Sequence, residues 1–187
     1  PLCLVRLARD LGSNTSVPQI EKPEEAIVIS ENSKIVLEGT VYLEELDFAA
    51  RSSAEADSWA DHIAKSVFGN EKDWMKTFKE RFVIVHDDVF SFFCETGTEV
   101  AARVRINDET KTVASGALWY EESLPTETIL AGLVWCDKVY GGKNSENRSA
   151  EEMLEHFCAA PLHLQIGGKA TVGKGLVRCM FDKGEKS

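Results

Sequence analysis

The chain has 187 residues and 43% of them are hydrophobic, so it can bury a core of its own as a single domain over residues 1–187. Its formal net charge of −10 excludes nucleic-acid binding by the overall field of the protein, and no apolar run is long enough to span a membrane. The five cysteines include no CxxC pair and have no metal-ligand spacing with the four histidines, which indicates free thiols in a reducing cytoplasm.

The first half of the chain alternates helical and strand-like patterns. The clearest amphipathic helix places Trp59, Ile63 and Val67 on one face and ends at Gly69. In chain order, the patterns predict a helix over residues 1–12, strands over 26–29 and 34–46 joined by a short turn, helices over 53–69 and 71–82, a buried strand over 82–85, and a helix over 89–95 capped by Asp87 or Asp88.

The second half of the chain is richer in strands. A strand, a polar tip and a returning strand predict a hairpin between Glu99 and Glu122. In chain order, the patterns predict strands over 99–106, 116–122 and 128–140, a helix over 144–160, and strands over 162–166 and 175–181. Strands with intervening helices indicate an α+β or α/β fold built on one sheet.

The segment LHLQIGGKATVGKG, residues 162–175, has four glycines, two lysines and no acidic residue. The acidity lies elsewhere, because residues 1–100 carry 10 basic and 19 acidic side chains, whereas residues 101–187 carry 11 and 12. The segment matches GxxxxGK, but Gly175 stands where a P-loop needs Ser or Thr to bind Mg²⁺, and a strand rather than a helix is predicted to follow. The other interpretations are a turn that needs positive φ, and a loop that lets a nucleic-acid backbone approach Lys169 or Lys174.

The predicted hairpin carries basic residues that could meet phosphates. Arg103 and Arg105 are two positions apart, so a strand presents them on one face, and Lys111 lies near the tip. A solvated edge hairpin whose charges block aggregation is an equal alternative. Glu121 and Glu122 alternate across a strand and cannot form an acid–base pair, and the chain has no nucleophile elbow. The residues therefore predict neither a catalytic site nor a metal site.

Two segments, GALWYEESLPTETILAGLV and LQIGGKATVGKGLV, together resemble the backbone RAMP subunit of the type III-B (Cmr) CRISPR effector complex. That family has an LWYEE.LP.ET segment followed by a strand, and a late IGG..TVGKG loop. The opening PLCLVRLARD resembles the helix that follows a central strand in the family, and VIVHDDVFSFFCETGTEVAARVRIN resembles the segment between these parts. The resemblance covers nearly the whole chain.

The resemblance implies an RNA-guided antiviral role. It implies a ferredoxin-like or RRM-type RAMP palm with insertions, and a thumb-like β-hairpin over residues 99–122. Copies of the subunit would form the helical backbone of the complex along a crRNA, with each thumb wedged between guide and target bases, while base pairing reads the sequence. The implied RNA-binding residues belong to the hairpin and the glycine-rich loop, namely Arg103, Arg105, Lys111, Gly167, Gly168, Lys169, Thr171, Gly173 and Lys174.

The resemblance also implies what this chain does not supply. Full-length family members cleave target RNA with an aspartate of an N-terminal loop and a divalent metal, and no matching loop occurs here. We therefore expect the C-terminal part of the subunit, without the N-terminal palm segment and with no cofactor of its own. Expected partners are crRNA, target RNA, other copies of the chain, other Cmr-complex subunits and an N-terminal fragment of the same subunit, all in the cytoplasm. The alternatives are a nucleotide-binding enzyme that uses the glycine-rich loop, and a purely structural interaction module.

Overall fold

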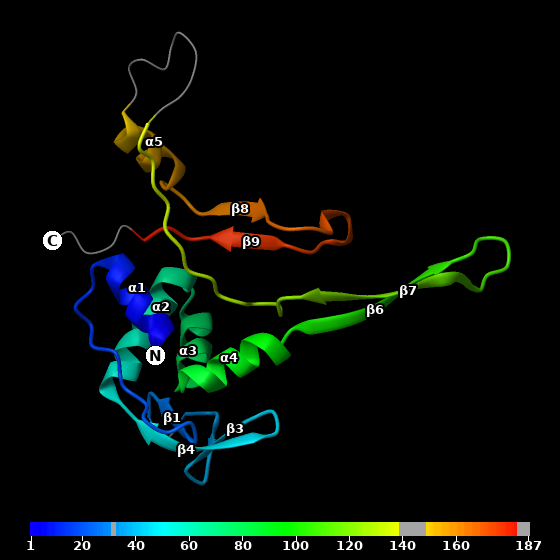
Figure 1. Ribbon diagram of the computed structural model, residues 1–187. Coiled ribbons are helices and arrows are strands. Elements are labelled where there is room, and N and C mark those ends of the chain that lie inside the picture. The colour runs from blue at the N-terminus through cyan, green and yellow to red at the C-terminus, as the bar shows by residue number, and fades with distance from the viewer. Residues whose placement is uncertain (31–32, 139–148, 183–187) are drawn as a thin grey trace.

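The computed structural model describes residues 1–30, 33–138 and 149–182. Figure 1 shows a body of strands and helices from which a long hairpin projects, with a second hairpin beside it. The helices are α1 Leu2–Leu11, α2 Ala54–Phe68, α3 Lys72–Glu80, α4 Asp87–Thr96, α5 Ala150–Phe157 and the 3₁₀ turn Ala170–Val172. The strands are β1 Glu25–Val28, β2 Val36–Leu37, β3 Thr40–Leu43, β4 Leu46–Ser52, β5 Val83–Val85, β6 Glu99–Ile106, β7 Val113–Ser123, β8 Leu162–Gln165 and β9 Leu176–Cys179.

The body is built on a five-stranded mixed sheet in the order β2-β3-β4-β1-β5. The pair β1 and β4 is parallel, and the other pairs are antiparallel. On one face Val28 and Phe48 are buried against Phe93 of α4, and on the other Ile27 is buried with Ala56 of α2 and Leu4 of α1. Helices therefore cover both faces of the sheet and complete an apolar core on each side. Because three of the four strand pairs are antiparallel, the fold is α+β, one of the two classes that the sequence predicts.

Helix α2 confirms the local signals in its sequence. The Ser53 hydroxyl caps it by accepting hydrogen bonds from the backbone N–H groups of its first turn, and Gly69 ends it with φ of 57°. Trp59 is 1% exposed, and its indole Nε1 donates to the Ser16 carbonyl oxygen at 2.9 Å. The hydrogen bond ties the loop after α1 to the core, since a buried indole N–H needs a partner.

Three features of the sheet differ from the prediction. Residues 34–46 do not form one strand, because Glu38 (φ 51°) and Gly39 (φ 80°) turn the chain between β2 and β3. Strand β1 lies between β4 and β5 and does not pair with its successor β2. The structure also has three separate sheets instead of one, since β6–β7 and β8–β9 each pair only with each other.

Other corrections concern element ends and one missing strand. His86 rather than an aspartate caps α4, because its Nδ1 accepts the Asp88 N–H at 3.2 Å, whereas Asp87 accepts the Leu2 N–H at 2.9 Å. Helix α5 starts after Ser149 in a capping box, and residues 144–148 of its predicted span lie outside the described residues.

The strand predicted over 128–140 is wrong across its described part. Residues 128–138 have no regular structure and no strand lies beside them, and residues 139–140 lie outside the described residues. Apolar side chains of this segment stay in solvent: Leu130 is 77% exposed and Trp135 is 79% exposed. Among the described residues, no helix is long and apolar enough to cross a membrane.

Candidate nucleic-acid interface

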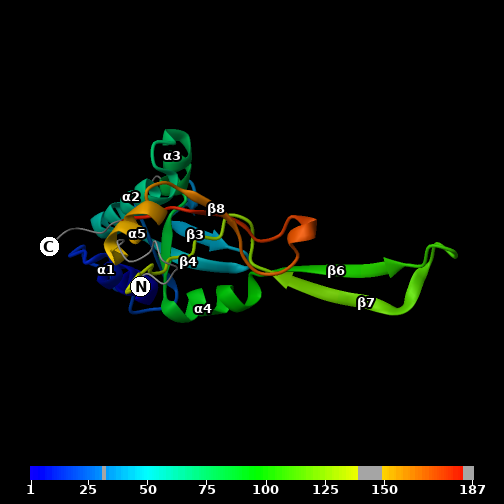
Figure 2. The ribbon, with the colours of Figure 1, turned by 90° about the horizontal axis from the view of Figure 1, so that it is seen from above.

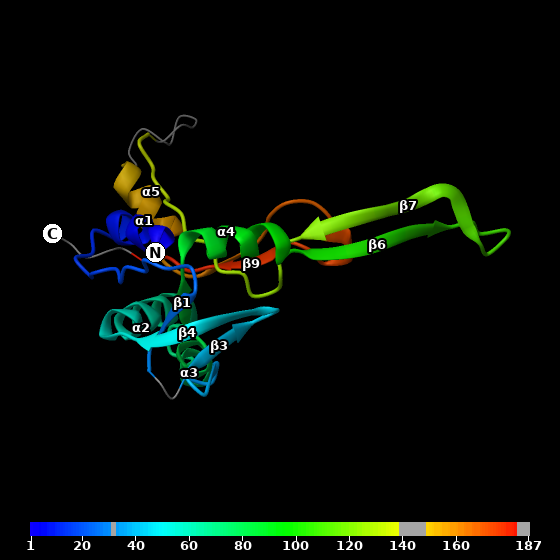
Figure 3. The same ribbon diagram turned by 60° about the horizontal axis from the view of Figure 1, so that its bottom comes forward.

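The hairpin of β6 and β7, which we call the thumb hairpin, has two chemically different faces. Its register sets Arg103 opposite Trp119 and Ala101 opposite Glu121, so these side chains share one face. Val104 stands opposite Leu118 on the other face, where apolar side chains are exposed to solvent. Figures 2 and 3 show the hairpin extending well away from the sheet, so both faces are accessible along most of its length.

The glycine-rich loop joins β8 to β9 and is shaped by residues with positive φ. Gly167, Gly173 and Gly175 have φ of 86°, 77° and 76°. At Gly175 a Cβ would lie 2.1 Å from the Ile166 carbonyl oxygen, so glycine is required there for space as well as for conformation. The loop is therefore a fixed turn, and its glycines are the reason why it closes.

Lys169 occupies a position in this loop where a lysine costs conformational energy. Its φ is 64°, in the left-handed region that glycine adopts freely. Holding a residue with a Cβ there costs on the order of 1 kcal/mol. Such strain is commonly kept where the side chain has a function, so the contacts of the Lys169 side chain indicate what the loop does.

The Lys169 side chain reaches across to the thumb hairpin and meets Glu121. Its Nζ lies 2.8 Å from Glu121 Oε1, which also accepts the indole Nε1–H of Trp119 at 3.0 Å. Glu121 Oε2 accepts the Nε–H of Arg103 at 3.2 Å. The hydrogen bond from Lys169, followed by the one from Trp119, lowers the pKa of Glu121 to about 2, with Arg103 adding to the effect. The carboxylate is thus ionised at neutral pH and gathers two cations at the base of the thumb hairpin.

A second lysine fixes the other side of the loop. Lys174 Nζ lies 2.6 Å from the Ser123 hydroxyl, at the last residue of β7. Within the loop the Gln165 side chain donates to the Gly167 carbonyl oxygen at 3.0 Å and holds the turn closed. The glycine-rich loop and the end of the thumb hairpin therefore form one continuous surface, although they lie far apart in the sequence.

The structure brings some of the predicted RNA-binding residues together and leaves others apart. Arg103, Lys169 and Lys174 meet at the base of the thumb hairpin. Arg105 lies farther out, where the strand pairing shifts between Val104 and Ile106, and Lys111 belongs to the turn at the tip. The loop residues Gly167, Gly168, Thr171 and Gly173 form the turn between β8 and β9.

Sequence reasoning missed three residues that organise this surface: Glu121, Trp119 and Ser123. Their contacts join two hairpins that are distant in the sequence, and no local sequence pattern predicts contacts of that kind. The only available signal was the alternation along β7, which places Trp119 and Glu121 on the same face. Only the register of β6 against β7 shows that Arg103 shares that face.

The loop lacks the structural context of a P-loop. The strand β9 follows it, so no helix N-terminus points at a phosphate held by the loop. The described residues also include no group of three or more His, Cys, Asp or Glu side chains placed to hold a metal ion. The nucleotide interpretation therefore fails on geometry as well as on the residue after Lys174.

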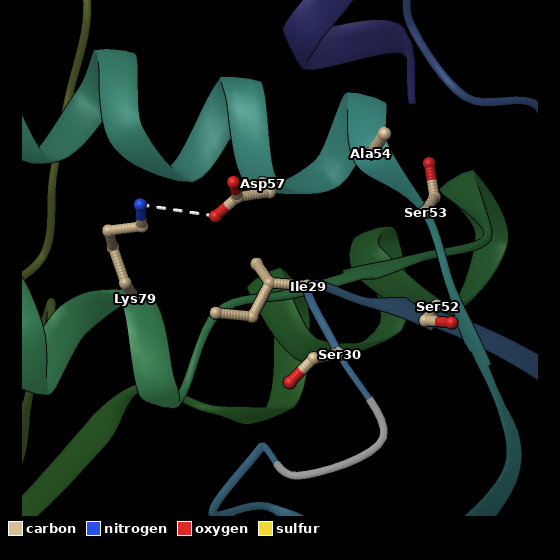
Figure 4. Close-up of a pocket in the computed structure, with 7 residues that line it drawn as sticks. All are labelled: Ile29, Ser30, Ser52, Ser53, Ala54, Asp57 and Lys79. Atoms are coloured by element: carbon tan, nitrogen blue, oxygen red, sulfur yellow. Dashed lines mark ion pairs between the residues drawn. The ribbon is translucent and has the colours of Figure 1, made fainter.

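A concave site lies elsewhere in the structure, at the carboxyl ends of the parallel strands β1 and β4. It has a volume of about 600 Å³ and is lined by Ile29, Ser30, Ser52, Ser53, Ala54, Asp57 and Lys79, as Figure 4 shows. Lys79 Nζ lies 3.1 Å from Asp57 and 3.3 Å from Asp61. Although burial acts to lower it, these carboxylates raise the pKa of Lys79 above its usual value. Two carboxylates already neutralise this cation, so the pocket is a poorer anion site than the base of the thumb hairpin.

Comparison with known proteins identifies the family of this chain. A model of the RAMP superfamily matches residues 4–178. The chain belongs to the RAMP superfamily. This RAMP chain is 36% identical over 182 residues to the CRISPR system Cmr endoribonuclease Cmr4 of Pyrococcus furiosus, with 95% of this chain and 59% of that protein covered. The resemblance to the Cmr RAMP subunit, expected from the sequence, is confirmed.

Solved structures share the fold of this chain. The crystal structure of oligomeric Cmr4 from Pyrococcus furiosus superposes with a TM-score of 0.57 and 24% identity, covering 94% of this RAMP chain and 61% of that chain. A further crystal structure of Cmr4 gives a TM-score of 0.55 and 26% identity, covering 95% and 61%. The RAMP chain thus spans about three fifths of the length of the relatives that it matches.

Proposed function

We propose that this RAMP chain binds crRNA and forms part of the helical backbone of an RNA-guided, RNA-targeting antiviral complex. The observation that carries the proposal is the meeting of Lys169 and Arg103 on Glu121, where the glycine-rich loop joins the thumb hairpin. Lysine and arginine held beside a backbone turn suit phosphates, and phosphate contacts carry no sequence information, which fits a protein whose specificity comes from base pairing. The family membership and the likeness to a Cmr endoribonuclease support the same role.

The two faces of the hairpin support its assignment as the thumb over residues 99–122. One face carries the polar network toward the loop, and the other exposes apolar side chains such as Val100 and Tyr120, which are 64% and 70% exposed. An apolar face on a projecting hairpin can lie against base edges while the polar face stays with the phosphates. We accordingly propose that the five-stranded sheet with its helices is a ferredoxin-like palm, and that β6–β7 is an insertion into it.

The proposal extends to partners and to the catalytic role of a complete subunit. The partners would be crRNA, target RNA, further copies of the chain, other Cmr-complex subunits and an N-terminal fragment of the same subunit, in the cytoplasm. Cleavage of target RNA would need a divalent metal in the complete subunit. The described residues include no group of three or more His, Cys, Asp or Glu side chains placed to hold it.

Binding of a labelled single-stranded RNA of about 40 nucleotides across a salt series tests the role, because each phosphate contact adds about one unit to the slope of log K against log salt. We compare the chain with a variant that combines Arg103→Ala, Lys169→Ala and Lys174→Ala. The matched control removes the same charge from α2 and α3, through Lys65→Ala, Lys72→Ala and Lys76→Ala.

We expect the triple variant to bind more weakly with a slope lower by roughly two to three units, and the control to keep the wild-type slope. Equal losses in both variants would mean that only net charge matters. Unchanged RNA binding by the triple variant would instead favour a structural interaction module whose loop is only a turn. A rise in the melting temperature with ATP would revive the nucleotide-binding alternative.

A further inference from the structure

Glu121 is an acidic residue at the centre of a surface that is proposed to bind an anion. Its side chain is 14% exposed, whereas the Lys169 and Arg103 side chains beside it are 56% and 42% exposed. Its carboxylate uses both oxygens to accept from three donors that come from β6, β7 and the loop. A carboxylate held in this way either competes with RNA for the two cations or holds them in place for it.

The contacts decide between these roles. A phosphate that displaced Glu121 would gain the donors that the carboxylate lost, while the carboxylate would keep only the Trp119 N–H in a largely buried position. Leaving a charge there without its partners is costly, so displacement brings no net gain. We therefore expect the carboxylate to keep its donors when RNA arrives.

The two cations keep donors that Glu121 does not use. Glu121 takes the Nε–H of Arg103, and within the described part of the chain no hydrogen bond is made by the Arg103 Nη groups. Lys169 likewise gives one of its three N–H donors to Glu121. Both side chains are exposed enough for the remaining donors to face solvent, so one carboxylate fixes a pair of cations with free donors on the same side of the hairpin.

We propose that Glu121 is a positioning residue of the RNA-binding surface: its carboxylate holds Lys169 and Arg103 together, so that their free N–H donors meet neighbouring phosphates of one RNA strand. The inference rests on the proposed function of this surface. It assigns to an acidic side chain a favourable effect on the binding of an acidic ligand. Net charge alone predicts the opposite sign, because removing a carboxylate makes the protein less negative.

The sign of the effect is measured with Glu121→Ala and Glu121→Gln, in the full chain and with the same single-stranded RNA. The matched control is Glu122→Ala, because Glu122 is the same residue type on the opposite face, where it accepts the Thr98 hydroxyl. We expect Glu121→Ala to weaken binding about tenfold and to lower the salt slope by one to two units, as two phosphate contacts lose their geometry. Glu121→Gln keeps an acceptor oxygen and falls in between, and the control stays at the wild-type value.

A mutant cycle that combines Glu121→Ala with removal of the two cations separates a positioning role of Glu121 from a general structural role. In a chain that already carries Arg103→Ala and Lys169→Ala, adding Glu121→Ala is expected to change neither affinity nor slope. The same weakening in that background would overturn the proposal, as would tighter binding by either Glu121 variant, which would make Glu121 a competitor of RNA. If Glu121→Ala perturbs the hairpin, Glu121→Gln decides the case.

Failure of the proposed function gives a different pattern. If the wild-type chain shows no salt-dependent RNA binding, or if Lys169→Ala and Arg103→Ala together leave it unchanged, then the surface does not bind RNA and the inference falls with the function. If those two substitutions weaken binding but Glu121→Ala does not, only the positioning role is refuted. The two failures are therefore distinguishable in one set of titrations.

Discussion

Gly175 closes the glycine-rich loop, and its replacement by alanine is expected to open the β8–β9 hairpin. The new Cβ would be strained at φ of 76° and would lie 2.1 Å from the Ile166 carbonyl oxygen. The left-handed conformation costs about 1 kcal/mol, and loss of the hydrogen bond from Ile166 N to Gly175 O, 2.8 Å long, costs about 1 kcal/mol more. Movement of the Ile166 carbonyl away from the Cβ brings the total to about 3 kcal/mol.

Native-state hydrogen exchange measures this cost locally, because a peripheral hairpin can open without unfolding the sheet. About 3 kcal/mol corresponds to a loss of protection of roughly 150-fold at the amides of the β8–β9 ladder. Gly173→Ala is the matched control: its φ is 77°, but a Cβ there meets nothing within 4 Å, so about 1 kcal/mol and a roughly fivefold loss are expected. Equal losses in the two variants would refute the claim that the approach to Ile166 makes Gly175 necessary.

Two further predictions concern the core and the site. Trp59→Phe removes the indole donor to the Ser16 carbonyl and leaves a small void, so the free energy of unfolding should fall by about 2–3 kcal/mol, seen as a lower urea midpoint with an unchanged m-value; an unchanged midpoint would contradict it. The Glu121 pKa of about 2 lies below its ordinary 4.5, so the stability that its ion pairs add is complete above pH 4.5 and is lost as pH falls through 2. Carbon-detected NMR titration should give this value, and Lys169→Ala should raise it; a titration near 4.5 in the wild type would refute the network.

Local elements of this RAMP chain could be predicted because their signals are local. Helix α2 has a capping serine, an apolar stripe through Trp59 and a closing glycine within one short stretch. The thumb hairpin likewise follows from two alternating runs around a polar tip. The parallel pairing of β1 with β4 could not be predicted, because the two strands are not consecutive in the chain and their pairing depends on contacts that no local pattern contains. Nothing in residues 26–29 distinguishes the two possible neighbours.

The candidate site divides in the same way. Composition marks the glycine-rich loop, and the alternation along β6 marks Arg103, so two of the three participants could be found without a structure. Their meeting on Glu121 could not be found, because it depends on how two separate hairpins are placed against each other. The strand predicted over 128–140 is an error of another kind, because a local pattern predicted an element that the structure lacks. Its apolar run has strand propensity, but no strand among the described residues pairs with it.

The arrangement around Glu121 shows how a chain of net charge −10 could hold RNA on one surface, as the proposed function requires. The acidic side chains are concentrated in residues 1–100, which build most of the sheet and its helices, whereas the thumb hairpin and the glycine-rich loop come from the more nearly neutral remainder. A phosphate at the base of the thumb hairpin would meet two cations and one carboxylate whose two oxygens already accept from three donors. Charges beyond a Debye length of about 8 Å are largely screened at physiological salt, so under the proposed function we expect this local balance to matter more for RNA binding than the overall charge.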